Sequence, residues 1–350
     1  MTSLTAVDAH DRRVANWLFV CCGLVFAMVV LGGFTRLTGS GLSMAEWRPI
    51  MGTLPPLTPE EWQRVFEIYK QTPEFQLVNS DMDVEGFKGI FWLEYLHRLL
   101  GRLIGIVYFV PLVVFALRGW IAPRRLPWYL FLLALGGTQA VIGKLMVASG
   151  QIDAPAVSQY KLAAHLGAAF LVYALMLWTA LNLLRRPEVK RAAATAPPHP
   201  WFGRAAAVLG LVSVTVFSGA FVAGLKAGKI YNTFPLMGDS WIAPGAMALE
   251  PAWRNFFDNP VMVQFDHRVL AMTTLVAVIA LWFGLRSRVG SRRLGLANHA
   301  LLGVVIVQVS LGILTLLSHV SIPLAAAHQA TGLLLVTAAL YLTHGLKQPE

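Results

Sequence analysis

Eight long apolar runs divide this chain, and they constrain its fold more than any other feature. A membrane-spanning helix needs about 20 mostly apolar residues, and each run reaches that length. Only 13% of the residues are charged, against about 25% in a typical soluble domain, and the mean hydropathy is +0.61. The sequence therefore predicts an all-α polytopic membrane protein with eight transmembrane helices, at residues 14–34, 89–117, 128–148, 159–184, 205–225, 260–284, 295–317 and 323–345.

The basic residues predict how these helices are oriented. Lys and Arg gather before the first run, in every second connection and after the last run, which places them on one side of the membrane. By the positive-inside rule that side is cytoplasmic, so both termini are expected there. This distribution accounts for the net charge of +10 without nucleic-acid binding. No transit peptide rich in Arg and Ser precedes the first run, which favours a bacterial inner membrane.

The order of long and short outer loops repeats once along the chain. In each half a long outer loop follows the first helix, and a short one joins the third to the fourth. Four helices per half give both halves the same orientation, so an axis along the membrane normal should relate two tandem four-helix bundles. The predicted parts are an N-terminal half at 1–190 with its long loop at 35–88, a cytoplasmic linker at 191–204 and a C-terminal half at 205–350.

The first long loop contains the signature of a short helix. The stretch Thr58–Glu61 has the pattern of a capping box, with proline at the first helical position. Trp62, Phe66 and Tyr69 follow at helical spacing. We expect one amphipathic helix that ends near Pro73 and lies on the membrane or on the helix bundle.

Four of the nine histidines occupy corresponding places in the membrane. Each lies about five to eight residues inside the outer end of a helix, which is on the order of 10 Å deep. Each has small or apolar neighbours, and two belong to each half. A single buried histidine is usually a hydrogen-bonded core residue, whereas four at one depth favour a shared functional role. They are His97, His165, His267 and His328.

Paired imidazoles from facing helices suit the iron of a heme held on both faces. Structural zinc is disfavoured, because no carboxylate or cysteine cluster completes either pair to four ligands. The two cysteines, Cys21 and Cys22, are adjacent inside the first apolar run and resemble small core residues. The residues therefore favour one heme site per half, and a purely structural role for the histidines remains the alternative.

Only the first half places a carboxylate beside its histidine. Glu94 stands three residues before His97 on the same helix face, whereas Gln264 holds that place before His267. A carboxylate in an apolar site can act as a base or stabilise a developing cation. The first half is thus predicted to be reactive and the second to be a redox relay. The alternative for Glu94 is a structural ion pair with Arg98.

Cations near the outer ends of the helices are candidates for binding heme propionates. Arginine suits carboxylate recognition because its guanidinium is planar and always charged. Ordinary snorkelling to the membrane interface is the alternative for each of them. The principal candidates are Arg36, Arg98 and Arg268, with Arg48, Lys226 and Lys229 in the long loops as further ones.

Several stretches, together with His165 and His328, resemble the heme A synthase family of bacteria and mitochondria. The likeness covers nearly the whole chain. It is to the branch shared by proteobacteria and mitochondria, because the first outer loop lacks the cysteine pair of the Gram-positive branch. The stretches are Gly33-Phe34-Thr35-Arg36-Leu37-Thr38, Gly41-Leu42-Ser43-Met44 with Trp47, Glu94-Tyr95-Leu96-His97-Arg98, Asn232-Thr233-Phe234-Pro235-Leu236-Met237 and Asp266-His267-Arg268.

The resemblance implies an oxidoreductase that acts on a CH group. It would oxidise the C8 methyl group of heme O to a formyl group by successive hydroxylations, with water as the oxygen source, and so supply heme A to cytochrome oxidase. It implies a heme b on His267 and His328, the heme O substrate on His97 and His165, and a catalytic role for Glu94. Heme O would be handed over by the farnesyltransferase heme O synthase. The sequence leaves a homo-oligomer open.

Two other classes of protein compete with this one. A diheme b-type membrane electron-transfer protein explains the four histidines equally well but leaves Glu94 without a role. A transporter built from an inverted repeat is disfavoured, because four helices per half make the repeat parallel.

Overall fold

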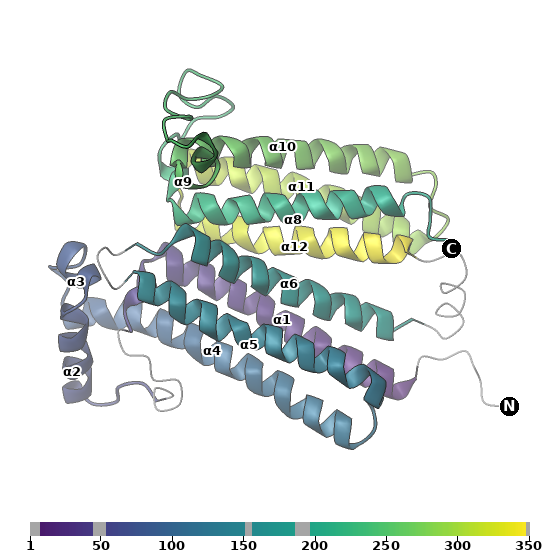
Figure 1. Cartoon of the computed structure of the whole chain (residues 1–350), viewed down its shortest axis with the longest axis horizontal. Helices are drawn as coiled ribbons and strands as arrows, with labels where there is room; N and C mark the ends of the chain where they lie inside the picture. Colours follow the sequence, from purple (N-terminus) through teal and green to yellow (C-terminus); the bar gives the residue numbers. More distant parts are fainter. Residues whose placement is uncertain (1–7, 45–53, 151–155, 186–196, 348–350) are drawn as a thin grey trace.

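The computed structural model describes residues 8–44, 54–150, 156–185 and 197–347, and this part of the chain contains eight helices long and apolar enough to cross a membrane. They lie side by side in one bundle (Figure 1). The predicted all-α membrane fold is therefore confirmed. The helices are α1 (Ala9–Leu37), α4 (Val84–Leu117), α5 (Leu126–Ser149), α6 (Gln159–Leu183), α8 (Phe202–Gly224), α10 (Pro260–Leu285), α11 (Arg292–Leu317) and α12 (Ile322–Leu346).

Polar caps make two of these helices longer than their apolar runs. The Asp8 carboxylate accepts from the backbone N–H of His10, so α1 begins before the predicted residue 14. The Asp83 carboxylate accepts from Gly86 N–H at 2.8 Å, so α4 begins before the predicted residue 89. A capped polar turn satisfies backbone donors that an apolar pattern does not reveal.

Each half packs as a ring of four helices. In the first, α1 contacts α4 and α6, and α5 contacts the same two. In the second, α8 contacts α10 and α12, and α11 contacts the same two. Between the halves, α1 packs on α12, α6 on α8 and α6 on α12. Exchanging the halves leaves this pattern unchanged, as the predicted two-fold axis requires. The axis itself remains a prediction, and residues 186–196, which include the predicted boundary at 190, lie outside the described residues.

The two ends of the bundle differ in their connections. The short helices α2 (Pro59–Lys70), α3 (Pro73–Leu77) and α9 (Asn255–Asp258) gather at one end, which we call the loop end (Figure 1). The start of α1 and the end of α12 lie at the opposite end, which we call the basic end because its connections carry the arginines noted above.

The main hydrophobic core lies toward the basic end and stops short of the histidines. On α6 its buried residues begin at Phe170, and on α12 at Leu333, in both cases beyond the histidine of that helix. On α1 they end at Val29. The histidine level thus lies outside the main core, and a smaller apolar cluster of Ala163, Ala220, Phe221 and Val263 packs α6, α8 and α10 together near it.

The predicted amphipathic helix is α2, and its capping box is confirmed. Thr58 Oγ1 accepts from Glu61 N–H, and the Glu61 carboxylate accepts from Thr58 N–H, both at 3.3 Å. The apolar face of α2 packs on the outer end of α4 in one cluster. Of the two places that the sequence left open, α2 thus lies on the bundle. The cluster consists of Trp62, Phe66, Tyr69, Phe87, Phe91 and Tyr95.

Candidate functional site

Each of the four predicted histidines packs against a glycine of a neighbouring helix. A Cβ atom added to that glycine would lie between 2.8 and 3.4 Å from the Cε1 atom of the imidazole. A larger residue would therefore crowd or displace the ring. The pairs are His97 of α4 with Gly32 of α1, His165 of α6 with Gly143 of α5, His267 of α10 with Gly219 of α8, and His328 of α12 with Gly312 of α11.

Hydrogen bonds fix the tautomer of both histidines in the second half. The Ser218 hydroxyl donates to the carbonyl oxygen of Thr215 at 2.7 Å, so its own oxygen accepts from Nδ1 of His267 at 2.8 Å. Nδ1 of His328 lies 3.1 Å from the Gln308 carbonyl oxygen, which can only accept. Both rings carry their proton on Nδ1 and keep a lone pair on Nε2. That is the form in which imidazole binds a metal, with Nδ1–H held by a second group.

The distance between His267 and His328 would allow both imidazoles to hold one metal. Their ring centroids lie 6.5 Å apart, and the ring planes cross at 87°. Two metal–nitrogen bonds of about 2.0–2.1 Å, with about 1.1 Å from each nitrogen to its ring centre, give a centroid separation of about 6 Å. The described residues contain no cluster of three or more His, Cys, Asp or Glu. Two imidazoles are the donor set that a heme requires.

The histidines of the first half are held differently. Nδ1 of His97 and Nδ1 of His165 are both buried without a hydrogen-bond partner among the described residues. The side-chain amide of Gln139, on α5 one turn before Gly143, is likewise buried and unpartnered. A buried polar atom without a partner costs about 1–3 kcal/mol. Their concentration around this pair suits a site that is completed by a ligand.

Glu94 is buried on α4 (3% exposed) and is held by three donors. Arg98 forms an ion pair with it, the Ser43 hydroxyl donates to it at 2.7 Å, and the backbone N–H of Met44 donates at 2.6 Å. Arg98 also donates to the Met44 carbonyl oxygen at 3.0 Å. The ion pair that the sequence left as an alternative is therefore present. It ties the first outer loop to α4.

The second half repeats this arrangement without the charge. The Gln264 amide and the Arg268 guanidinium both donate to the carbonyl oxygen of Tyr231, at 3.1 and 2.9 Å. Arg268 also donates to the carbonyl oxygens of Pro235 and Leu236. Each half thus fastens its long loop with an arginine and the residue four positions before it. Only the first half uses a carboxylate there.

The predicted propionate-binding arginines differ in their hydrogen-bond partners. Arg98 and Arg268 hold loop carbonyls, although Nε of Arg268 is buried without a partner among the described residues. The guanidinium of Arg36, in the last turn of α1, has no hydrogen bond or ion pair with any residue that the structure describes. Arg48 and Trp47 lie outside the described residues. Propionate binding by Arg36, Arg98 and Arg268 stays a prediction.

Sequence reasoning missed the groups that hold the site residues. Ser218 stands directly before Gly219, whereas Leu31 holds that place before Gly32 in the first half. This difference explains why His267 has a partner for Nδ1 and His97 has none. A hydroxyl next to the contacting glycine was the signal that could have revealed Ser218. No local signal identifies Ser43, because its contact with Glu94 spans the first outer loop.

Fold and site together define a class: a multi-pass helical membrane protein with a layer of paired histidines. The chain belongs to the COX15-CtaA family, whose model, described as cytochrome oxidase assembly protein, matches residues 15–340. The predicted family is thereby confirmed.

Similar proteins include both bacterial and mitochondrial members. The heme A synthase of Nitrosospira multiformis is 48% identical over 97% of this chain and 95% of its own length. That of Parvibaculum lavamentivorans is 43% identical over 99% of this chain and 98% of its own. The human heme A synthase COX15 is 45% identical over 97% of this chain and 84% of its own. This chain has no cysteines besides Cys21 and Cys22, in agreement with the predicted branch.

Proposed function

We propose that this protein is a heme A synthase, which oxidises the C8 methyl group of heme O to a formyl group. The methyl group and one water together become a formyl group, four protons and four electrons, so that two hydrogens leave the methyl carbon and two leave the water. Each of the two successive hydroxylations uses one water, the diol that they form releases one water, and the electrons are withdrawn through the second heme. The names of the relatives support the product.

We assign different roles to the two halves because their histidines are held differently. Nδ1 has a hydrogen-bond partner in His267 and His328, whereas Nδ1 of His97 and of His165 has none among the described residues.

In this proposal the N-terminal half (1–190) binds heme O through His97 and His165, and the C-terminal half (205–350) holds a heme b through His267 and His328. Bound heme supplies one-electron redox chemistry there. Ser218 and the Gln308 carbonyl keep the imidazoles of the second half oriented.

The contacts of Glu94 favour one of its two candidate roles. A carboxylate offers about four lone-pair positions, and three are taken by Arg98, Ser43 and Met44. These three donors hold the carboxylate in one position on α4. A carboxylate held in a fixed position is suited to stabilise positive charge that develops at the substrate methyl carbon. We therefore assign charge stabilisation to Glu94.

The proposal also includes the orientation of the enzyme in the membrane and its partners. The basic end faces the cytoplasm of a bacterial cell, both termini lie there, and the histidine layer lies near the periplasmic side of the inner membrane. The farnesyltransferase heme O synthase delivers the substrate, and a homo-oligomer is compatible with the fold.

Pigment extraction tests the overall function. Purified protein should release heme b together with heme O or heme A. Two molecules of heme b per chain, with neither of the farnesylated hemes, would instead identify a diheme electron-transfer protein. A diheme electron-transfer protein would not need a carboxylate at position 94. In the second half, Gln264 fastens the long loop together with Arg268 without a negative charge.

The Glu94→Gln variant tests the catalytic role. Glutamine at 94 keeps one side-chain oxygen that can accept from Ser43 and Met44, so it should still fasten the first outer loop. We expect heme A formation to fall by about a hundredfold or more, with the heme b absorbance unchanged. Glu85→Gln is the matched control, since Glu85 is an exposed carboxylate of the same helix that pairs with Lys88. Heme A yields equal to those of the control would remove Glu94 from the mechanism.

A further inference from the structure

Gln139 is a buried polar side chain to which the proposed function gives no role. It lies on α5, four residues before Gly143, the glycine that contacts His165. Residues four apart share one face of a helix, so Gln139 is on the face of α5 that is turned to the histidines of the first half. The nitrogen and the oxygen of its amide are both buried without a hydrogen-bond partner among the described residues. Such an amide can both donate to and accept from a ligand.

Gln139 and Glu94 lie on opposite sides of the histidines along the bundle. α5 runs from the basic end to the loop end, so four residues place Gln139 about 6 Å nearer the basic end than Gly143 (Figure 1). α4 runs the other way, so three residues place Glu94 about 4.5 Å nearer the loop end than His97. A ligand held by the histidines therefore has Glu94 near one edge and Gln139 near the opposite edge.

The second half shows how an amide at this position is directed. Gln308 holds the corresponding place on α11, four residues before Gly312. A Cβ atom added to Gly332 would lie 3.4 Å from Nε2 of Gln308, and Gly332 is one turn nearer the basic end than His328. The Gln308 side chain thus extends toward the facing helix on the basic-end side of the histidine. Only its oxygen is buried and unpartnered there, whereas both amide atoms of Gln139 are.

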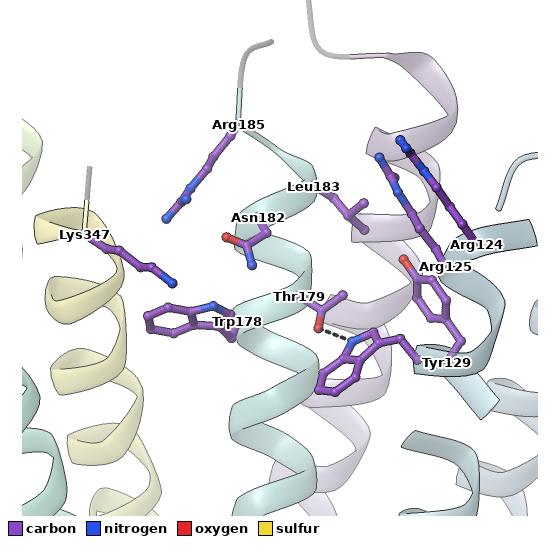
Figure 2. A pocket seen from close by; sticks show the side chains of 10 residues that line it. Arg124, Arg125, Tyr129, Trp178, Thr179, Asn182, Leu183, Arg185 and Lys347 are labelled. Carbon is purple, nitrogen blue, oxygen red and sulfur yellow. Dashed lines mark hydrogen bonds between the residues drawn. The ribbon is translucent and has the colours of Figure 1, made fainter. Parts of the chain in front are cut away.

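The space beside Gln139 ends at the main core. Leu132, two turns nearer the basic end on the same face of α5, is buried in that core together with Tyr129. Closer to the basic end, the Trp128 indole N–H donates to the Thr179 hydroxyl of α6 at 2.9 Å and joins the two helices (Figure 2). Between Gln139 and Leu132 this face of α5 carries no other polar side chain. Gln139 is therefore the polar group at the inner limit of the substrate site.

Heme O differs from heme B in one substituent, a hydroxyethylfarnesyl group in place of a vinyl group. This substituent is on the side of the porphyrin away from the propionates, whereas the C8 methyl group is next to a propionate. When the propionates face the arginines of the loop end, the C8 methyl group faces the Glu94 side and the hydroxyl of the farnesyl substituent faces the Gln139 side.

We infer that the Gln139 amide forms a hydrogen bond with the hydroxyl of the hydroxyethylfarnesyl group and so selects heme O over heme B. The inference rests on the proposed function, because it takes heme O as the ligand of His97 and His165. Bound heme B leaves both amide atoms unpartnered, whereas the hydroxyl of heme O can accept from Nε2 or donate to Oε1. A site that pairs with a substrate hydroxyl discriminates against the analogue that lacks it. Heme A keeps the same hydroxyl, so Gln139 binds substrate and product without taking part in the oxidation.

A competition experiment tests this role without any turnover. Full-length protein in nanodiscs is incubated with equal concentrations of heme O and heme B, unbound heme is removed, and the bound hemes are extracted and separated by chromatography. In Gln139→Leu we expect the ratio of bound heme O to heme B, counted beyond the heme b of the second half, to fall about fivefold, because one hydrogen bond is lost. Thr138→Val is the control and should keep the wild-type ratio, since the exposed Thr138 hydroxyl donates only to the Leu135 carbonyl oxygen.

A second competition separates the hydroxyl from the farnesyl chain. The competitor is dehydrated heme O, which has lost the hydroxyl and keeps the chain. The wild type should prefer heme O about fivefold, and Gln139→Leu should bind the two equally. Equal binding of the two by the wild type would overturn the inference even if the variant fails to fold, and so would equal ratios in Gln139→Leu and Thr138→Val. A wild type that does not prefer heme O even to heme B would contradict the proposed function itself, and the inference with it.

Discussion

At the scale of single residues, hydrogen bonds hold the two histidines of the second half in fixed orientations. The Ser218 hydroxyl is committed as a donor to Thr215, which forces its oxygen to accept from His267. Groups that hold the far nitrogen of a ligating imidazole orient the ring and raise its basicity. Leu31 replaces such a group in the first half, where a substrate must enter and leave.

The Ser218→Ala variant tests this role. Without the acceptor, Nδ1 of His267 loses its partner, and we expect heme b to be retained about tenfold less tightly or worse. The reduction potential of the remaining heme b should rise, because the imidazole becomes less basic. Heme absorbance per protein after challenge with a heme scavenger, and a redox titration, measure the two effects. Ser213→Ala is the control on the same helix, since Ser213 is exposed and donates only to Leu209. Identical heme loss from both variants would contradict the role given to Ser218.

At the scale of elements, a buried acid joins α3 to α2. Glu74 of α3 is only 7% exposed and accepts from the Tyr69 hydroxyl of α2 at 3.2 Å. Burial raises the pKa of Glu74 from 4.5 to about 7. The hydrogen bond from Tyr69 and the charge of Lys226 oppose this rise in pKa, whereas the charge of Glu94 adds to it. The first outer loop therefore contains a carboxyl group that titrates near neutral pH.

The sign of the pH effect on this packing follows from that pKa. Glu74 binds its proton more tightly in the packed state than in the unfolded one, so packing is penalised as the pH rises from about 5 to about 8. The protection factors of the α2 and α3 amides in hydrogen–deuterium exchange, which correct for the intrinsic rise of the exchange rate with pH, should fall over this range. Glu74→Gln should remove most of the pH dependence, whereas Glu67→Gln, at an exposed site on α2, should keep it. Unchanged pH dependence in Glu74→Gln would show that another group titrates.

At the scale of the whole molecule, the two halves are joined at the histidine layer itself. The Gln329 amide, next to His328, donates to the Val29 carbonyl oxygen of α1 at 2.7 Å. A Cβ atom added to Gly33 would lie 2.8 Å from the Gln329 side-chain oxygen, so the contact is close. Because Gly32 contacts His97, one hydrogen bond and one helix turn link the histidines of the two halves.

The Gln329→Leu variant tests this link. It removes one hydrogen bond, which contributes about 0.5–1.5 kcal/mol, and should lower the melting temperature. The heme b spectrum should shift as well, because α12 carries His328. Thr337→Val is the matched comparison, since Thr337 also bonds across the halves, to Tyr173 at 2.9 Å, but inside the main core. That variant should lower the melting temperature without shifting the spectrum. A spectral shift in both variants, or in neither, would contradict the claim that Gln329 links the first half to the histidines of the second.

The sequence by itself determined the eight spans, the four histidines and the unequal position of Glu94. Bilayer thickness and helical rise turn run length and residue position directly into membrane depth, so these features need no knowledge of packing. The capping box of α2 was readable for the same reason, since Thr58 and Glu61 act within one turn.

Only the tertiary structure decided how those residues are held. Ser43 reaches Glu94 across 51 positions, so no local pattern reveals that contact. Ser218 reaches His267 across 49, and its place before Gly219 is a signal only once α8 and α10 are known to be neighbours. The seat of α2 on α4 and the glycine opposite each histidine both depend on which helices become neighbours. Which helices become neighbours depends on the packing of the whole bundle, so no single stretch of the sequence predicts it.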